Sequence, residues 1–191
     1  MTDARIVRTR ASLHAAVLQL AATKPATEIT VSELAVAADI NRVTFYKHYL
    51  TPGEALREAL TQDLTQARTT ALSSLAEAEP RDAFLATLNL ALDHIERHRA
   101  IYTFSFTAPD DGTGMYVLAT HFTSIVRMYL DARLTLPPPL PEFDPQLLAS
   151  LIGTGFVGPV FLWLTSGRHD REDLIKTLSV LTPEWWFPQA S

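Results

Sequence analysis

With 191 residues, 47% of them hydrophobic and 19% charged, the chain has the composition of a globular protein with a substantial core, which excludes a disordered chain. The net charge of −5 argues against a protein that coats nucleic acid by charge alone, and the lack of cysteine excludes disulfides and thiolate metal sites. The first residues do not have the pattern of a secretory signal, so we expect a cytoplasmic protein.

The first predicted element is an amphipathic helix over residues 5–22. Its apolar positions recur with helical spacing and place Leu13 and Val17 on one stripe. The pair Lys24-Pro25 follows as a helix breaker, so we expect this helix to end near Thr23.

Three further helix starts occur within residues 29–54. Thr30 and Glu33 have the spacing of a capping box, in which each side chain binds the backbone N–H of the other. Asn41 stands where a second N-cap is needed, and Pro52 fits the first position of a third helix, where its missing N–H has no cost. This segment therefore predicts three helices that begin directly after Thr30, Asn41 and residue 51.

The first two of these helices, with a tight turn at residues 38–40, form a helix-turn-helix pattern. The side chains that we expect to be exposed on the second helix are Arg42, Thr44, Tyr46, Lys47 and His48. Such side chains suit base edges and phosphates, although they would also suit the solvated face of a small bundle. Two observations favour DNA. Residues 1–50 carry six basic and four acidic side chains, and Tyr46 and Tyr49 are large aromatics on a helix too short to bury everything.

The remaining helices follow in chain order, beginning with a long one that starts at Pro52 and should connect two domains. We expect the later helices at residues 81–98, 101–107, 115–134, 147–164 and 170–181. A proline-rich connector at residues 137–145 cannot be helical, and no segment alternates as a strand would. The sequence thus predicts an all-α protein with a DNA-binding domain at residues 1–50 and a helical domain at 51–191.

The segment with the three helix starts reads ITVSELAVAADINRVTFYKHYLTPGEAL, and it resembles the tetracycline-repressor (TetR) family of bacterial transcriptional regulators. The resemblance covers residues 5–60. It implies that Thr30, Ser32, Thr44, Tyr46 and His48 hold phosphates and that Asn41, Arg42, Val43 and Lys47 lie nearest the groove. It also implies a homodimer on a palindromic double-stranded DNA operator, most simply a repressor that a small hydrophobic effector releases.

The sequence departs from the family pattern at two positions. Asp39 stands where the family has a turn glycine, and aspartate tolerates a left-handed backbone better than most residues. Pro52 replaces a lysine that the family often uses to touch phosphate. We therefore expect a strained but intact turn and one phosphate contact fewer.

An effector site needs an apolar cavity with a few polar groups, and aromatic residues are dense in the second domain. His121, which lies among apolar residues, is the best polar candidate, but a hydrogen-bonded core histidine is an equally good interpretation. The predicted effector pocket comprises Leu64, Phe84, Leu88, Phe104, Leu118, His121, Phe122, Ile125 and Trp163.

The last two predicted helices resemble the family's dimerisation helices. The residues predicted at this interface are Leu151, Gly155, Phe156, Pro159, Leu174 and Leu178. We expect Pro159 to bend its helix. Residues 147–164 carry no charge, so a membrane span is the competing interpretation. It is disfavoured because the run is short, contains Gly-Pro and lacks flanking basic anchors. We expect no membrane partner.

A rival hypothesis from another class is a small helical enzyme with a metal at His94 and His98, which are spaced i, i+4. The neighbouring charged residues instead indicate a solvated helix face, and the sequence offers no third ligand at motif spacing. A helical adaptor without a ligand is a further alternative. We expect no catalytic residues, no cofactor and no metal.

Overall fold

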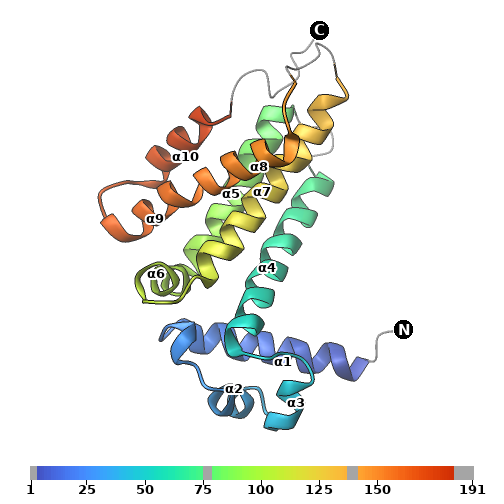
Figure 1. Cartoon of the computed structure of the whole chain (residues 1–191), viewed down its shortest axis with the longest axis vertical. Coiled ribbons are helices and arrows are strands. Elements are labelled where there is room, and N and C mark those ends of the chain that lie inside the picture. Colours follow the sequence, from blue (N-terminus) through green and yellow to red (C-terminus); the bar gives the residue numbers. More distant parts are fainter. Residues whose placement is uncertain (1–3, 75–78, 137–141, 183–191) are drawn as a thin grey trace. The chain divides into compact units, whose positions relative to one another are not determined.

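A computed structural model of the protein describes residues 4–74, 79–136 and 142–182, and the regular structure of these residues is entirely helical (Figure 1). The elements are α1 (Ala4–Ala21), the 3-10 helix η1 (Ala26–Glu28), α2 (Val31–Ala37), α3 (Arg42–Tyr46), α4 (Pro52–Ser74), α5 (Pro80–Arg97), α6 (Arg99–Thr107), α7 (Thr113–Leu134), α8 (Pro145–Gly155), α9 (Val157–Ser166) and α10 (Arg171–Val180). The predicted all-α fold class is confirmed. Most of the predicted proline-rich connector lies outside the described residues.

The chain forms two compact units. The first comprises Met1–Thr65 and His94–Val117, and the second comprises Gln66–Asp93 and Leu118–Ser191. Helices α4, α5 and α7 each contribute residues to both units. The first unit therefore combines the helix-turn-helix segment with α6. The domain boundary near residue 50 stays a prediction.

The three predicted helix starts in the first unit are all formed. The Glu33 N–H donates to Thr30 Oγ1 at 3.2 Å, and the Thr30 N–H donates to Glu33 Oε2 at 2.9 Å, which completes the capping box. Asn41 Oδ1 accepts from the Thr44 N–H at 2.7 Å and caps α3. Helix α4 begins at Pro52. These local contacts fix the residues at which α2 and α3 begin.

An apolar core holds the first unit together. Its fully buried members include Leu13, Val17, Leu34, Phe45, Leu56 and Leu60. They come from α1, α2, α3 and the first part of α4, so each short helix is fixed by its packing against the longer ones. Burial of a leucine or phenylalanine side chain contributes roughly 1.5–3 kcal/mol.

The second unit has its own core, in which aromatic rings pack edge to face. Phe122 and Phe156 lie with ring centroids 5.4 Å apart, and Phe84 and Tyr129 lie 5.7 Å apart. Gly153 of α8 packs so closely on α7 that a Cβ atom there would overlap the backbone of Thr123. A glycine at this position thus permits close contact between the two helices.

The uncharged run is divided into α8 and α9 at Phe156, whereas the sequence predicted one helix over residues 147–164. The reason is Pro159, whose nitrogen cannot donate to the Gly155 carbonyl one turn earlier. By length and composition alone, Pro145–Ser166 would be able to cross a membrane, and among the described residues it is the one such segment. Within the protein 44% of its most apolar window is buried.

Candidate nucleic-acid interface

The turn between α2 and α3 depends on a left-handed residue. Asp39 has φ of 53°, and its N–H donates to the Val36 carbonyl at 3.1 Å. The Ile40 N–H donates to the Ala35 carbonyl at 3.0 Å and closes the turn. The prediction that Asp39 occupies the position of a turn glycine is confirmed. A left-handed backbone conformation costs an L-residue roughly 1–2 kcal/mol. This cost is smaller for aspartate than for most other residues.

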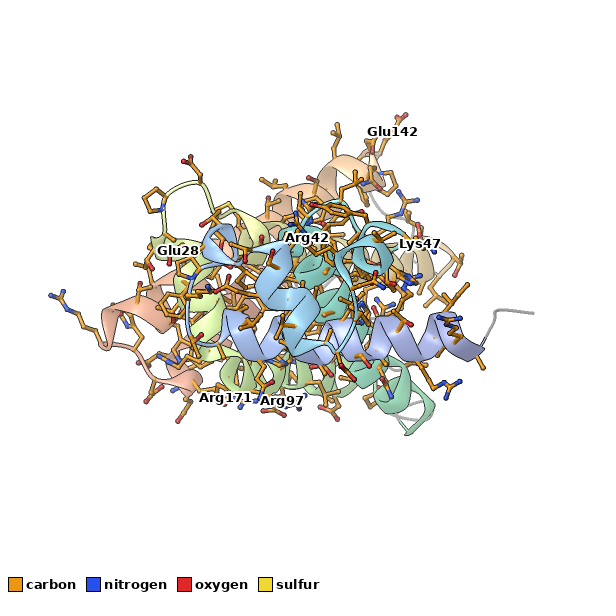
Figure 2. The ribbon with its side chains drawn as sticks, turned by 90° about the horizontal axis from the view of Figure 1, so that it is seen from below. Glu28, Arg42, Lys47, Arg97, Glu142 and Arg171 are labelled. Atoms are coloured by element: carbon orange, nitrogen blue, oxygen red, sulfur yellow. The ribbon has the colours of Figure 1, made fainter. Side chains whose placement is uncertain are left out.

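The residues predicted to contact DNA gather on α2, α3 and the turns beside them. Those that are exposed are Thr30, Ser32, Asn41, Arg42, Val43, Tyr46 and Lys47, while Thr44 and His48 are half-buried. Val43 is 69% exposed and Tyr46 is 51% exposed, so both side chains are accessible to a partner. Arg42 lies at the first position of α3 and Lys47 at its C-cap (Figure 2).

The positive charge of α3 is available to a partner. Among the ion pairs of the described residues, none involves Arg42 or Lys47. Lys24, by contrast, pairs with Glu33 at 2.7 Å. The hydrogen bonds from Lys24 and Thr30 lower the pKa of Glu33 to about 2, so this cap remains ionised at neutral pH. An anion that approaches α3 therefore meets two unpaired cations.

Tyr49 does not belong to this exposed surface, whereas Tyr46 does. Tyr49 is only 3% exposed, and its hydroxyl lies 2.6 Å from His14 Nε2. Its ring lies 6.2 Å from that of Phe45, and the Arg10 guanidinium lies 5.8 Å from its centroid. Tyr49 follows the end of α3, where the chain turns back to α1 and can bury the ring.

Arg10 and His14 of α1 serve the fold of the first unit. Arg10 forms an ion pair with Glu58 of α4, and His14 Nε2 lies 3.8 Å from the same carboxylate. Burial lowers the pKa of His14, which favours the neutral ring. Arg10, one of the six basic side chains of residues 1–50, is therefore paired within the first unit.

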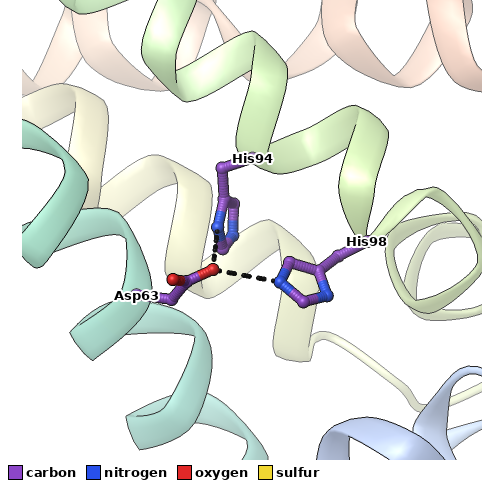
Figure 3. A group of neighbouring side chains, drawn as sticks. All are labelled: Asp63, His94 and His98. Carbon is purple, nitrogen blue, oxygen red and sulfur yellow. Dashed lines mark hydrogen bonds and ion pairs between the residues drawn. The ribbon is translucent and has the colours of Figure 1, made fainter.

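A histidine cluster lies elsewhere in the first unit (Figure 3). Asp63 of α4 places Oδ2 2.9 Å from His94 Nδ1 and 3.0 Å from His98 Nε2. Arg97 Nη1 lies 3.3 Å from the same oxygen, and His94 Nε2 lies 2.9 Å from the Tyr102 hydroxyl. One ligand atom from each of Asp63, His94 and His98 can be chosen so that all three lie within 4.8 Å of one another.

Burial and hydrogen bonds together decide the charges in this cluster. Burial lowers the pKa of His94, which is 1% exposed, to about 4. Burial would raise the pKa of Asp63, but the hydrogen bonds from His98 and His94 outweigh it, and that pKa is lowered. At neutral pH the cluster therefore contains a carboxylate and a neutral His94. The expectation that His94 lies on a solvated face is wrong. Asp63 was missed because it is 31 residues from His94 in the chain.

The residues of the predicted effector pocket are distributed over both units. In the first unit, Leu64 is buried and Phe104 is half-buried. In the second unit, His121 is half-buried with its ring 5.7 Å from that of Phe122. The remaining members, all buried in the second unit, are Phe84, Leu88, Leu118, Phe122, Ile125 and Trp163. That these residues form one effector pocket stays a prediction.

The residues predicted at the dimer interface differ in how far they are buried. Leu151 is 70% exposed, Gly155 is exposed and Pro159 is half-buried. Phe156, Leu174 and Leu178 are buried in the core of the second unit. Their side chains would therefore stabilise the helices that form an interface and would not contact a partner directly. Pro159, Leu174 and Trp163 also line an open cavity of about 220 Å³ beside α9 and α10. The interface itself stays a prediction.

No family model matches the chain, and no curated protein matches it. Solved structures do match along nearly its whole length. FadR of Thermus thermophilus, a TetR-family transcriptional repressor in complex with lauroyl-CoA, has a TM-score of 0.66 at 20% identity and covers 95% of this chain and 97% of its own.

Two further structures show the same likeness. A TetR transcriptional regulator from Rhodococcus sp. RHA1 has a TM-score of 0.64 at 17% identity, with 93% of this chain and 94% of that chain covered. The fatty acid degradation regulator FadR from Bacillus halodurans has a TM-score of 0.63 at 14% identity, with the same coverage. The chain therefore has the fold of TetR-family transcriptional regulators.

Proposed function

We propose that this protein is a TetR-family transcriptional regulator that binds a palindromic double-stranded DNA operator as a cytoplasmic homodimer. The proposal rests on the structure and exposure of α3. This short helix is capped by Asn41 and closed on α2 by the Asp39 turn, and it exposes Arg42, Val43 and Lys47. A helix fixed in this way is suited to enter a major groove.

Three exposed side chains of α3 and its C-cap match features of DNA. Arg42 at the first helical position can reach the O6 and N7 acceptors of guanine, the commonest specific contact in the major groove. The exposed side chain of Val43 can make an apolar contact with the methyl group of thymine. Lys47 at the C-cap suits a phosphate, which fixes the position of the helix without reading sequence.

The second unit supports dimerisation with an exposed apolar surface on α8, α9 and α10. Its exposed apolar side chains are Leu147, Leu151, Phe161, Leu162, Val180 and Leu181. Soluble monomers rarely leave such a group of large apolar side chains in water. We propose that a second copy of the chain covers this surface, which also explains why an uncharged segment of this length occurs without a membrane.

Regulation would follow from a small hydrophobic effector bound in the predicted helical domain at residues 51–191. Support comes from its aromatic core and from the fold shared with FadR of Thermus thermophilus, whose structure contains lauroyl-CoA. Effector binding would favour a conformer with a different separation of the two recognition helices. Two recognition helices that bind successive major grooves on one face of DNA must lie roughly 34–36 Å apart. A dimer with a different separation would therefore dissociate from its operator. On this proposal the protein is a repressor and has no enzymatic activity.

The proposal is tested with DNA from upstream of the protein's own gene, in a fluorescence anisotropy titration at moderate salt. Arg42→Ala and Lys47→Ala should each weaken binding, and Arg42→Ala should also reduce the preference over shuffled DNA of equal length. Lys176→Ala is the matched control, because Lys176 is an exposed lysine of α10 paired with Glu172 at 2.8 Å. Wild-type affinity in both α3 variants would contradict a DNA-binding role for this helix.

A further inference from the structure

We propose that Asp63, His94 and His98 form a binding site for a divalent transition-metal ion of the zinc type. The three residues come from α4, α5 and the turn between α5 and α6, and all belong to the first unit (Figure 3). Two imidazole nitrogens and one carboxylate oxygen are ligands that zinc accepts, and three protein ligands leave a fourth position for water or another small ligand. The site stands apart from the proposed DNA contacts of α2 and α3.

The distances between the ligand atoms fit such an ion. Asp63 Oδ2 lies 2.9 Å from His94 Nδ1 and 3.0 Å from His98 Nε2. Two ligand atoms about 2.0–2.2 Å from a tetrahedral zinc ion lie roughly 3.3–3.5 Å apart. The carboxylate oxygen would therefore have to move away from each ring nitrogen by a few tenths of an ångström. The three ligand atoms lie within 4.8 Å of one another, so the two imidazoles would have to approach each other as the ion binds, to roughly 3.3–3.5 Å between their ligand nitrogens.

The hydrogen bonds of His94 allow the nitrogen that faces Asp63 to become a ligand. Without the ion, a proton on Nδ1 donates to Asp63 while Nε2 accepts from the Tyr102 hydroxyl. To bind the ion, His94 moves this proton from Nδ1 to Nε2, which then donates to the Tyr102 oxygen. A hydroxyl serves both arrangements because it can donate and accept. The ring stays neutral, and no proton is lost in the exchange.

His98 completes the site from a more open position. Its ring is half-buried, and it lies 4.8 Å from the His94 ring between centroids. Its Nε2 proton, which donates to Asp63, passes to Nδ1 when the ion binds. Arg97 is 59% exposed at its side chain and can move to the second carboxylate oxygen. The ion can thus enter from the His98 side without unfolding the buried part of the cluster.

A bound ion would link α4 to the end of α5 through Asp63, His94 and His98. Helix α4 begins six residues after α3 ends, so its position bears on how the recognition helix is presented. A metal ion that holds α4 would therefore alter the affinity for DNA. This consequence rests on the proposed function, whereas binding of the ion does not.

Metal binding is tested on the full chain after treatment with a chelator and its removal. Calorimetric titration with Zn²⁺ should show one site per chain, and Co²⁺ should give the visible absorption of a cation with nitrogen and oxygen ligands. Asp63→Asn and His98→Gln should each weaken Zn²⁺ binding by roughly tenfold or more. His169→Gln, at an exposed histidine outside the cluster, is the matched control and should bind as the wild type does.

His98→Gln is the variant on which the test depends, because His98 is only half-buried and its loss should leave the fold intact. Circular dichroism verifies this. Equal Zn²⁺ affinity in the wild type, Asp63→Asn and His98→Gln would overturn the site. The DNA titration with and without Zn²⁺ is a separate measurement. If Zn²⁺ binds at the cluster and DNA affinity is unchanged, the regulatory consequence is overturned and the metal site is upheld.

Discussion

The backbone N–H of Ala26 donates a hydrogen bond of 3.0 Å to Oδ2 of Asp111, which is 5% exposed. The other carboxylate oxygen accepts from the Thr113 N–H at 3.1 Å, at the start of α7. One buried carboxylate thus joins the 3-10 helix after α1 to the turn between α6 and α7. Within the first unit, it connects the helix-turn-helix segment to a part of the chain 85 residues away.

Asp111→Ala should lower the free energy of unfolding, because it leaves two backbone N–H groups without their acceptor. A buried donor that loses its partner costs about 1–3 kcal/mol. Asp111→Asn keeps one carbonyl oxygen and should cost less. Urea unfolding followed by circular dichroism measures both. Equal stability of Asp111→Ala and wild type would show that the carboxylate does not hold the two segments together.

Asp39→Gly should keep or slightly raise the stability of the protein, because glycine adopts the left-handed backbone without a steric penalty. Asp39→Val should lower it by roughly 1–2 kcal/mol, since a β-branched residue is strained at φ of 53°. Thermal unfolding of the two variants makes the comparison. A valine variant as stable as the glycine variant would contradict the strained turn.

Asn41→Ala should cost roughly 0.5–2 kcal/mol, because α3 loses the side-chain acceptor of its N-cap. Asn41→Ser retains a capping oxygen on a shorter side chain, so its stability should be near that of wild type. If Asn41 also contacts DNA, the serine variant will bind DNA more weakly while it unfolds normally. Unfolding and DNA titrations of both variants separate the two roles.

Stability should fall as the pH is lowered through 6.5, and His14 should contribute to this fall. Burial lowers the pKa of His14 below its ordinary value of 6.5, so the unfolded chain takes up a proton at a pH where the folded chain does not. His14→Gln removes the titrating group but can still bond to Tyr49. The slope of unfolding free energy against pH should therefore be smaller in this variant below pH 7. An unchanged slope would show that His14 does not contribute.

Leu151→Arg should convert the proposed homodimer to a monomer, because it places a charge in the exposed apolar surface of α8. Sedimentation velocity measures the change. Val36→Arg makes the same substitution at an exposed valine of α2 in the first unit and should leave the oligomeric state unchanged. A dimeric Leu151→Arg protein would place the interface elsewhere.

The sequence by itself determined the features that depend on neighbours three or four residues away. The capping box of Thr30 and Glu33, the Asn41 cap and the left-handed Asp39 are all such features, and all are formed. Their hydrogen bonds close within a single turn, so spacing along the chain is enough to predict them. The exposed character of Arg42 and Lys47 follows from the same local register.

Only the tertiary structure decided the rest. Tyr49 is buried because α1 brings His14 beside it, and Asp63 meets His94 across 31 residues. Asp111 reaches Ala26 across 85 residues. No local periodicity encodes such pairs, because they depend on how whole helices pack around a shared core. The helix-turn-helix was therefore predictable from local hydrogen bonds. The histidine cluster was not, because it depends on the packing of α4 beside α5.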